Sequence, residues 1–279
     1  MRITKCGIDI VRGCQLRCVG CPISGLRTKI EYMPVERFQK ILSNINVSKI
    51  ELLRLFNFGE PMLHPELVKL VRQIPRHFKG IVDEVELSTN AQVLRPSDIR
   101  KIMHDGIVTR IAVSCDGDGT PEEFERLRPP AKFDKLMEFV RFVGLEKRRT
   151  QSNIELVTRT VLTGTGPDRI RWRRLMRPHG FEPLFRGRFQ LSNSVDFHRP
   201  DTIPGGLCRF LSGAKGKRLY VDVDGTVVPC CRHPRAFAMG NILDVPFKQL
   251  ITTKTYRTKV EDLRLNRGSV PICAECEKT

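Results

Sequence analysis

The sequence predicts an α/β fold: a partial (β/α)6 barrel of the TIM-like kind, followed by a small C-terminal α+β module. From about residue 5 to about residue 190, short aliphatic and β-branched runs alternate with amphipathic segments, which indicates repeated βα units and a parallel sheet. After about residue 195 this alternation stops, and a loop and then a hairpin pattern follow. We therefore expect the barrel in residues 1–195 and the module in residues 196–279.

Six runs rich in aliphatic and β-branched residues are the expected barrel strands. They cover residues 7–11, 49–57, 84–88, 109–114, 154–162 and 182–189. In an α/β barrel the reacting groups lie at the C-terminal ends of the strands. We therefore expect the chemistry in the loops that follow these runs.

Five amphipathic segments between the strands are the expected helices. Several begin with a proline in the first turn, where the missing N–H costs no hydrogen bond. The segments cover residues 34–45, 65–78, 96–104, 132–147 and 167–176. The last one contains the densest basic run, in which we expect Ile170, Leu175 and Met176 in the core and the arginines in solvent.

The C-terminal module is expected to contain a hairpin over residues 218–230, because Asp224-Gly225 between alternating apolar residues is a strong turn signal. A helical stretch over residues 245–265 follows. It leads to Cys273 and Cys276. This mixture of strands and helix predicts an α+β module.

The 279-residue chain carries a formal net charge of +17, which fits an anionic substrate, an acidic electron-donor protein or a nucleic acid. The charge is dispersed, and an aromatic content of 7% offers little for base stacking, so a nucleic acid is possible but not favoured. The chain shows neither a long apolar run nor a secretory signal. We therefore expect a cytoplasmic protein with no membrane partner.

Cysteines gather near both ends of the chain, and in a reducing compartment such clusters indicate metal ligands. Cys14, Cys18 and Cys21 follow the first strand with C-x3-C-x2-C spacing. Three thiolates leave one position of a metal centre open for chemistry, whereas a structural zinc site needs a fourth ligand. The spacing predicts an open metal centre; a zinc knuckle completed by Cys6 is the alternative.

This spacing resembles the signature of the radical S-adenosylmethionine (SAM) superfamily. The resemblance implies a 4Fe-4S cluster on Cys14, Cys18 and Cys21, with SAM chelating the iron that lacks a cysteine. It also implies that an electron from the cluster cleaves SAM, and that the resulting 5′-deoxyadenosyl radical abstracts a substrate hydrogen. A flavodoxin- or ferredoxin-type protein is then the expected electron donor.

Three further motifs occur at strand ends in the family's order. Residues 58–61 resemble the GGEP motif, although a phenylalanine replaces its first glycine; residues 88–90 resemble STNG without the final glycine, and residues 114–117 resemble S-x-D-G. In the family these motifs contact the amino group, ribose or carboxylate of SAM. The cofactor-binding residues that the resemblance implies are Phe58, Gly59, Glu60, Pro61, Ser88, Asn90, Ser114 and Asp116.

Arg159 stands within the otherwise apolar fifth strand. Alternation gives Arg159 and Val157 the same face, so the guanidinium either enters the barrel or forms an outward ion pair. Inside the barrel it would suit the SAM carboxylate or an anionic substrate group through a bidentate contact. Arg159 is therefore a candidate for both cofactor binding and catalysis.

The second cysteine group, Cys208, Cys230, Cys273 and Cys276, resembles the reduced SPASM or "twitch" module of radical SAM enzymes, which binds one auxiliary 4Fe-4S cluster. Structural zinc is the alternative. An auxiliary cluster could accept an electron from a substrate radical, which gives a dehydrogenation. If a thiol instead returns a hydrogen atom, the result is an epimerisation, for which Cys231 is the catalytic candidate; otherwise Cys231 is a small buried residue without a role.

The compact arrangement most resembles aminocyclitol dehydrogenases and sugar epimerases. No leader-binding domain precedes Cys14, which favours a small-molecule substrate of the polyhydroxylated or amino-sugar type. Radical SAM modification of a peptide, a nucleotide or RNA is an alternative. A basic, non-enzymatic zinc protein that binds nucleic acid is a more distant one.

Overall fold

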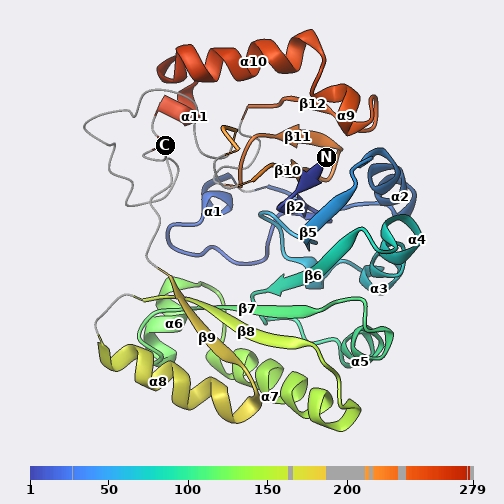
Figure 1. Cartoon of the computed structure of the whole chain (residues 1–279). Coiled ribbons are helices and arrows are strands. Elements are labelled where there is room, and N and C mark those ends of the chain that lie inside the picture. The colour runs from blue at the N-terminus through green and yellow to red at the C-terminus, as the bar shows by residue number, and fades with distance from the viewer. Residues whose placement is uncertain are drawn as a thin grey trace.

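A curved, mostly parallel sheet with helices on its outer face forms the body of the protein in the computed structural model (Figure 1). The structure describes residues 1–26, 28–162, 166–186, 211–213, 216–231, 237–274 and 276. Within them, the strand order is β12-β11-β10-β2-β5-β6-β7-β8-β9, and β1 pairs with β5. The predicted partial barrel is confirmed.

The barrel strands run parallel to one another in chain order from β2 to β9. They are β1 (Arg2–Ile3), β2 (Lys5–Ile8), β5 (Lys49–Arg54), β6 (Val82–Thr89), β7 (Arg110–Asp116), β8 (Glu155–Val161) and β9 (Glu182–Arg186). A separate two-stranded sheet, β3 (Val11–Arg12) with β4 (Glu31–Tyr32), flanks the cysteine loop that carries α1 (Pro22–Leu26).

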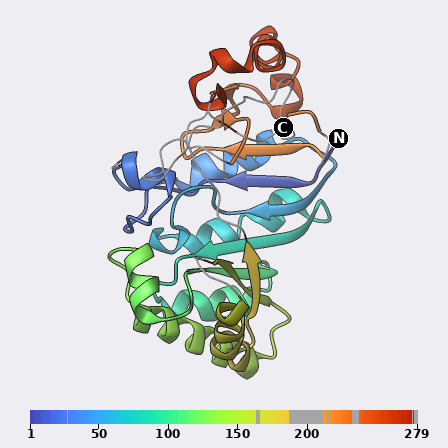
Figure 2. The same ribbon diagram turned by 90° about the vertical axis from the view of Figure 1, so that its left-hand side faces the viewer.

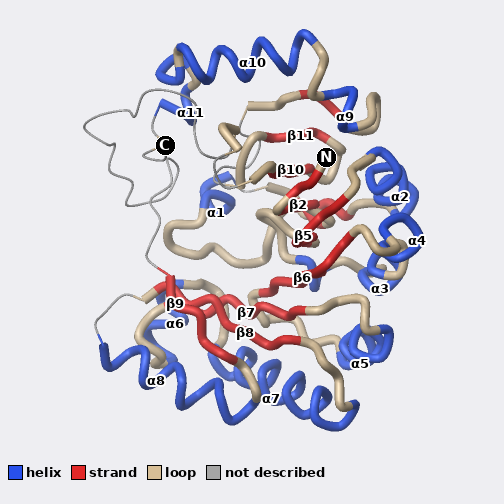
Figure 3. The backbone as a smooth tube through the Cα atoms, in the orientation of Figure 1, coloured by secondary structure: helices blue, strands red, loops and turns tan. Residues whose placement is uncertain are grey.

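Helices cover the outer face of the sheet and leave its concave side for the site (Figures 1 and 3). They are α2 (Val35–Asn44), α3 (Leu67–Val71), α4 (Ile74–Phe78), α5 (Pro96–Asp105), α6 (Pro121–Leu127), α7 (Phe133–Thr150) and α8 (Gly166–Met176). The apolar spacing explains their orientation: in α5, Ile99, Ile102 and Met103 form one buried stripe. Gly106, with φ of 63°, ends that helix in the left-handed conformation.

Several predicted elements need correction. The segment 65–78 forms two helices, α3 and α4, because Pro75 lacks the N–H that would bond to the carbonyl of Val71. The helix α6 was not predicted. In α8 the expected core residue Ile170 is 51% exposed, whereas Trp172 is fully buried.

The C-terminal module continues the barrel sheet (Figure 2). The predicted hairpin forms from β10 (Arg218–Val221) and β11 (Thr226–Val228), and β12 (Gly240–Asn241) extends it. Strand β10 also pairs in parallel with β2. The segment 245–265 divides into α9 (Phe247–Leu250) and α10 (Lys254–Leu265), because Thr253 caps a new helix; α11 (Pro271–Ala274) follows.

One cluster of buried apolar residues lies between the sheet and the helices and reaches into the module. Its largest fully buried members include Trp172, Phe38, Phe124 and Phe139. In the parts of the chain that the structure describes, no helix is long and apolar enough to cross a membrane.

Candidate active site

A cavity of about 350 Å³ opens at the C-terminal ends of the strands. This volume is typical of small-molecule sites. Its wall combines the N-terminal cysteine loop with residues at, or just after, the C-terminal ends of β5 to β8. The predicted site residues that line it are Cys14, Cys18, Cys21, Phe58, Gly59, Glu60, Ser88, Asn90, Ser114 and Asp116. Pro61 is buried in a short 3-10 helix and is not among the lining residues.

The three cysteines share this wall without converging on one point. Among the described residues, no three His, Cys, Asp or Glu side chains could hold a single metal ion. A 4Fe-4S cluster fits such a spread, because each cysteine binds a different iron. Burial raises the pKa of Cys14 to about 12 and also raises the pKa of Cys18, so cluster binding would have to displace thiol protons.

The turn after β5 is held from two sides. The buried carboxylate of Asp9 accepts hydrogen bonds from the amides of Asn57, Phe58 and Gly59 at 2.6, 2.9 and 3.2 Å. A Cβ atom on Gly59 would lie 1.7 Å from the carbonyl oxygen of Val11, so only glycine fits at this position. The turn is thereby pressed against the cysteine loop.

Glu60 joins this turn to the end of β6. Its buried carboxylate accepts hydrogen bonds from the Met62 amide at 3.0 Å, the Thr89 hydroxyl at 2.7 Å and the Asn90 amide at 2.7 Å. Burial raises the pKa of Glu60. The carboxylate therefore already has three donors where the family resemblance implies a SAM contact.

The side chain of Asn90 lies against the cysteine loop. Its Nδ2 donates to Cys14 Sγ at 3.3 Å, and its amide group also bonds to the amide group of Gln15. Asn90 can therefore influence a metal-bound thiolate directly, a role that the motif alone did not predict.

Arg128 is a buried cavity residue that the sequence analysis missed. Its Nη1 donates to Asp116, and the other carboxylate oxygen of Asp116 accepts from the Val161 amide at 3.2 Å. Burial alone would lower the pKa of Arg128, but Cys18 and Asp116 raise it. An isolated arginine after a short helix gives no sequence signal in so basic a chain.

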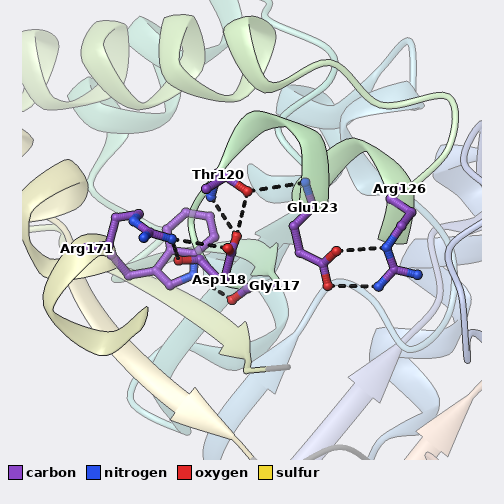
Figure 4. A network of polar contacts seen from close by, with 7 residues as sticks. Gly117, Asp118, Thr120, Glu123, Arg126 and Arg171 are labelled. Atoms are coloured by element: carbon purple, nitrogen blue, oxygen red, sulfur yellow. Dashed lines mark hydrogen bonds and ion pairs between the residues drawn. The ribbon is translucent and has the colours of Figure 1, made fainter. Parts of the chain in front are cut away.

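A polar network holds the segment between β7 and α6 (Figure 4). The indole of Trp172 donates to the carbonyl of Gly117, and Asp118 accepts from the amide and hydroxyl of Thr120 at 2.8 and 2.7 Å. The Thr120 hydroxyl in turn caps α6 by accepting from the Glu123 amide. Arg171 of α8 completes the network by donating to Asp118.

The end of α6 contacts the cysteine loop through its backbone. The Val19 amide donates to the Leu127 carbonyl at 2.8 Å, and the Arg17 amide donates to the Pro129 carbonyl at 2.6 Å. The network of Figure 4 therefore supports the loop that carries the three cysteines.

Arg159 enters the barrel. It is in register with Ser114, and neighbouring residues in register point to the same face of a sheet. Its guanidinium pairs with the buried carboxylate of Glu86, which also meets Arg54 at 3.0 Å. Arg159 does not line the cavity. The structure therefore shows neither of the two arrangements expected from the sequence, an outward ion pair or a direct contact of Arg159 with the cavity.

The C-terminal cysteines are only partly described. Cys208 lies outside the described residues, and Cys273 lies on α11. Cys230 and Cys231 pack against Tyr220 and Val228. Within the described residues these cysteines do not form a single-ion site.

Cys231 faces the barrel interior. It is near enough to affect the pKa values of Lys5, Arg54 and Tyr220 electrostatically. The pKa of Tyr220 is raised by burial and by this thiol.

Two family models match the chain. Residues 8–154 match the radical SAM superfamily, and residues 208–277 match SPASM, an iron-sulfur cluster-binding domain. The curated relatives include GTP 3′,8-cyclase of Rhodopseudomonas palustris (strain ATCC BAA-98 / CGA009), which is 27% identical over 166 residues, or 58% of this chain and 46% of the relative. The same enzyme of Rhizobium etli (strain ATCC 51251 / DSM 11541 / JCM 21823 / NBRC 15573 / CFN 42) is 28% identical over 138 residues, which are 49% of this chain and 38% of the relative. The chain thus spans less than half the length of these relatives.

Solved structures share the fold. The complex of BtrN with AdoMet (SAM) and 2-DOIA has a TM-score of 0.60 at 15% identity, with 99% of this chain and 94% of BtrN covered. Hexahistidine-tagged anSMEcpe with bound AdoMet has a TM-score of 0.64 at 16% identity, with 93% of this chain and 80% of anSMEcpe covered. At these identities the likeness concerns the fold alone. Because the radical SAM model matches more than half of the sequence, the chain belongs to the radical SAM superfamily, and it carries a SPASM iron-sulfur cluster-binding domain in its C-terminal part.

Proposed function

We propose that this radical SAM enzyme is an oxidoreductase or epimerase that acts on a small polyhydroxylated or amino-sugar-like molecule. One observation carries the proposal: Cys14, Cys18 and Cys21 share a cavity with the strand-end residues Ser88 and Ser114. A 4Fe-4S cluster and SAM bound there would supply reductive SAM cleavage and hydrogen-atom abstraction. The likeness of the fold to BtrN solved with AdoMet and 2-DOIA supports a small substrate.

In this proposal the three cysteines hold the cluster, and the strand ends hold SAM. Phe58, Gly59, Glu60 and Pro61 form the turn for its amino group, which the hydrogen bonds of Asp9 keep rigid. The residues proposed for its ribose and carboxylate are Ser88, Asn90, Ser114 and Asp116, all of which line the cavity. Arg128 adds a positive charge beside Cys18, which favours the thiolate form that binds iron.

We assign the auxiliary 4Fe-4S cluster to Cys208, Cys230, Cys273 and Cys276. All four lie within or at the start of the matched SPASM segment, which supports a module over residues 196–279 beside a barrel over residues 1–195. A flavodoxin- or ferredoxin-type protein is the proposed electron donor.

Cys231 is the proposed hydrogen-atom donor if the reaction is an epimerisation. Its position beside Lys5, Arg54 and Tyr220 in the barrel interior supports this role. Donation would convert the substrate radical to a C–H bond and leave a thiyl radical, which needs one electron and one proton to return to the thiol. In a dehydrogenation the substrate radical would instead lose an electron to the auxiliary cluster and a proton to a base.

Isotope labelling distinguishes the two reactions. The reconstituted enzyme is incubated in D2O with SAM, dithionite and a panel of aminocyclitols and sugars, and the products are weighed by mass spectrometry. One solvent deuterium in the product, lost in Cys231→Ala, identifies an epimerase; a product two hydrogens lighter, unaffected by Cys231→Ala, identifies a dehydrogenase. Failure of every compound in the panel to stimulate 5′-deoxyadenosine formation would contradict the proposed substrate class.

A nucleotide substrate is the second candidate. The curated relatives are GTP 3′,8-cyclases, and the interior of this barrel carries Lys5, Arg54 and Arg159. SAM cleavage that is stimulated by a nucleoside triphosphate, but not by the sugar panel, would favour this candidate.

A further inference from the structure

A group of cations lies inside the barrel, next to the cavity. Lys5 of β2, Arg54 at the end of β5 and Arg159 of β8 form it, and we call these three residues the interior cation cluster. Arg54 Nε lies 3.0 Å from Glu86 Oε1, and Arg159 Nη2 donates to Glu86 Oε2. Lys5 precedes Gly7 by two residues on the same strand face, and the Tyr220 ring packs over Gly7.

The charges of this cluster are not balanced by the described residues. Glu86, whose side chain is fully buried, is shared by Arg54 and Arg159. Lys5 has no hydrogen-bond or ion-pair partner in the described ranges. Burial, followed by the charge of Arg54, lowers the pKa of Lys5 to about 8. The three half-buried cations thus face one carboxylate among the described residues, and a bound anion would offset their excess positive charge.

Arg110 provides a contrast on the same face of the sheet. It is also near Glu86, at 3.6 Å, but it pairs with Glu84 at 2.8 Å and with Glu155. Its charge is therefore balanced by two carboxylates besides that of Glu86. Arg54 and Arg159, by contrast, share the single carboxylate of Glu86, and Lys5 has no ion-pair partner in the described ranges.

The ring of Phe56 connects the cluster to the cavity. Phe56 lines the cavity, and the guanidinium carbons of Arg54 and Arg159 lie 5.5 and 5.9 Å from its centroid. Arg159 precedes the cavity residue Val161 by two positions, a step of about 7 Å along a strand. The side chains of Arg54 and Arg159 are 20% and 21% exposed, so both remain accessible.

We propose that the substrate carries an oxyanion, either a phosphate or a carboxylate group, and that Lys5, Arg54 and Arg159 bind it. This inference rests on the proposed function, because it places the substrate between the SAM cavity and Cys231. Guanidinium groups bind both oxyanions through paired hydrogen bonds, and the ammonium group adds a point charge. The bound oxyanion supplies the counter-charge that Glu86 alone cannot provide.

Because the chain is strongly basic overall, the test must report on Lys5 itself. The reconstituted enzyme, without reductant, is treated with an amine-acetylating reagent at about pH 8, and the modification rate of each lysine is read by mass spectrometry. Inorganic phosphate and succinate are added in separate arms. The exposed Lys69, which pairs with Glu66 on the surface, is the internal control.

A bound oxyanion should keep Lys5 protonated and slow its acetylation at least about fivefold, the change in neutral fraction that a one-unit rise in pKa produces near pH 8. The arm with the stronger effect identifies the oxyanion. Lys69 should react equally in all arms. Arg159→Gln should abolish the protection, whereas Arg177→Gln, which removes an equal charge from a surface pair with Glu182, should retain it.

Two results would overturn the proposal: equal behaviour of Lys5 and Lys69 in the wild-type enzyme, or full protection of Lys5 in Arg159→Gln. The first needs no variant and therefore no assumption about variant folding. Since the assay involves no SAM cleavage, its failure would leave the radical SAM reaction itself untouched.

Discussion

Two single residues, Asp9 and Gly59, determine the position of the turn that carries Glu60. Asp9 binds three consecutive amides of the turn, and Gly59 allows its backbone to approach Val11. Neither residue needs to touch SAM for this effect. Both act by fixing where the cavity-lining groups of the turn lie.

Gly59→Ala should destabilise the protein by about 3 kcal/mol, because the new methyl group cannot coexist with the Val11 carbonyl unless the backbone moves. SAM binding should weaken with it. Gly80→Ala is the control: Gly80 has a positive φ but open space around it, so its cost should be about 1 kcal/mol. Equal losses in the two variants, measured by denaturant unfolding, would show that the contact with Val11 is unimportant.

Asp9 should make stability depend on pH. Burial, with a smaller effect of Asp222, raises the pKa of Asp9 from 3.8 to about 7. The folded state therefore holds this proton where the unfolded state has lost it, and stability falls as the pH rises from about 4 to about 7. Asp9→Asn keeps an oxygen that can accept hydrogen bonds from the three amides. It should remove the part of the pH-dependent loss of stability that Asp9 causes. Thermal unfolding midpoints across that range test this; an unchanged slope in Asp9→Asn would contradict it.

The sequence was informative about residues that follow a motif at a strand end. It predicted that Ser88 and Ser114 would lie near the first cysteines, and the cavity contains them all. It did not predict Arg128 or Lys5, because their importance depends on partners and burial that only the folded chain defines. Arg159 was left between two orientations, since alternation identifies a strand face but not which face is inside.

Among the elements, α6 links the strand end at β7 to the cysteine loop. Its first turn is capped by Thr120, and the backbone after its last turn bonds to Val19 and Arg17. Loss of the cap at the first turn of α6 can therefore displace the cysteine loop that is bonded to its last turn.

Thr120→Ala should cost about 1 kcal/mol of stability through loss of the helix cap. Thr120→Ser retains the hydroxyl and should therefore keep most of the stability that Thr120→Ala loses. Thermal unfolding gives the comparison, and the iron content of the reconstituted protein shows whether the cysteine loop is affected. If Thr120→Ala were as stable as the wild type, α6 would not depend on the network in Figure 4.

Element boundaries were predicted least well where a side-chain bond or a proline decides them. Periodicity joined α3 to α4 and α9 to α10, because both pairs have a continuous apolar pattern. Pro75 and the cap formed by Thr253 divide them. The periodic signal describes which face is buried, and it is insensitive to one missing hydrogen bond.

At the scale of the whole molecule, the barrel and the C-terminal hairpin form one sheet. Strand β10 pairs with β2 along four residues, from Arg218 with Lys5 to Val221 with Ile8. The change of pattern near residue 195 predicted a separate module but could not indicate this pairing, because parallel partners far apart in sequence carry no local signal. The pairing brings Tyr220 and Cys231 to the barrel interior.

A fragment of residues 1–195 should therefore fail to form a stable monomer. Without β10, the edge of β2 would expose unpaired backbone groups and the apolar surface that Leu219 and Val221 cover. Light scattering should show aggregation, and circular dichroism should show no cooperative melting. A monomeric fragment that melts cooperatively would mean that the hairpin is dispensable for the barrel.

The central claim is that Cys14, Cys18 and Cys21 form the centre at which SAM is cleaved. Its most direct test is 5′-deoxyadenosine formation by the anaerobically reconstituted protein with SAM and dithionite, measured by liquid chromatography and mass spectrometry. The wild type should form 5′-deoxyadenosine, and a variant with all three cysteines changed to alanine should form none while retaining the iron of the auxiliary cluster. A wild-type protein that is loaded with iron and binds SAM but forms no 5′-deoxyadenosine, or a triple variant that still forms it, would contradict the claim.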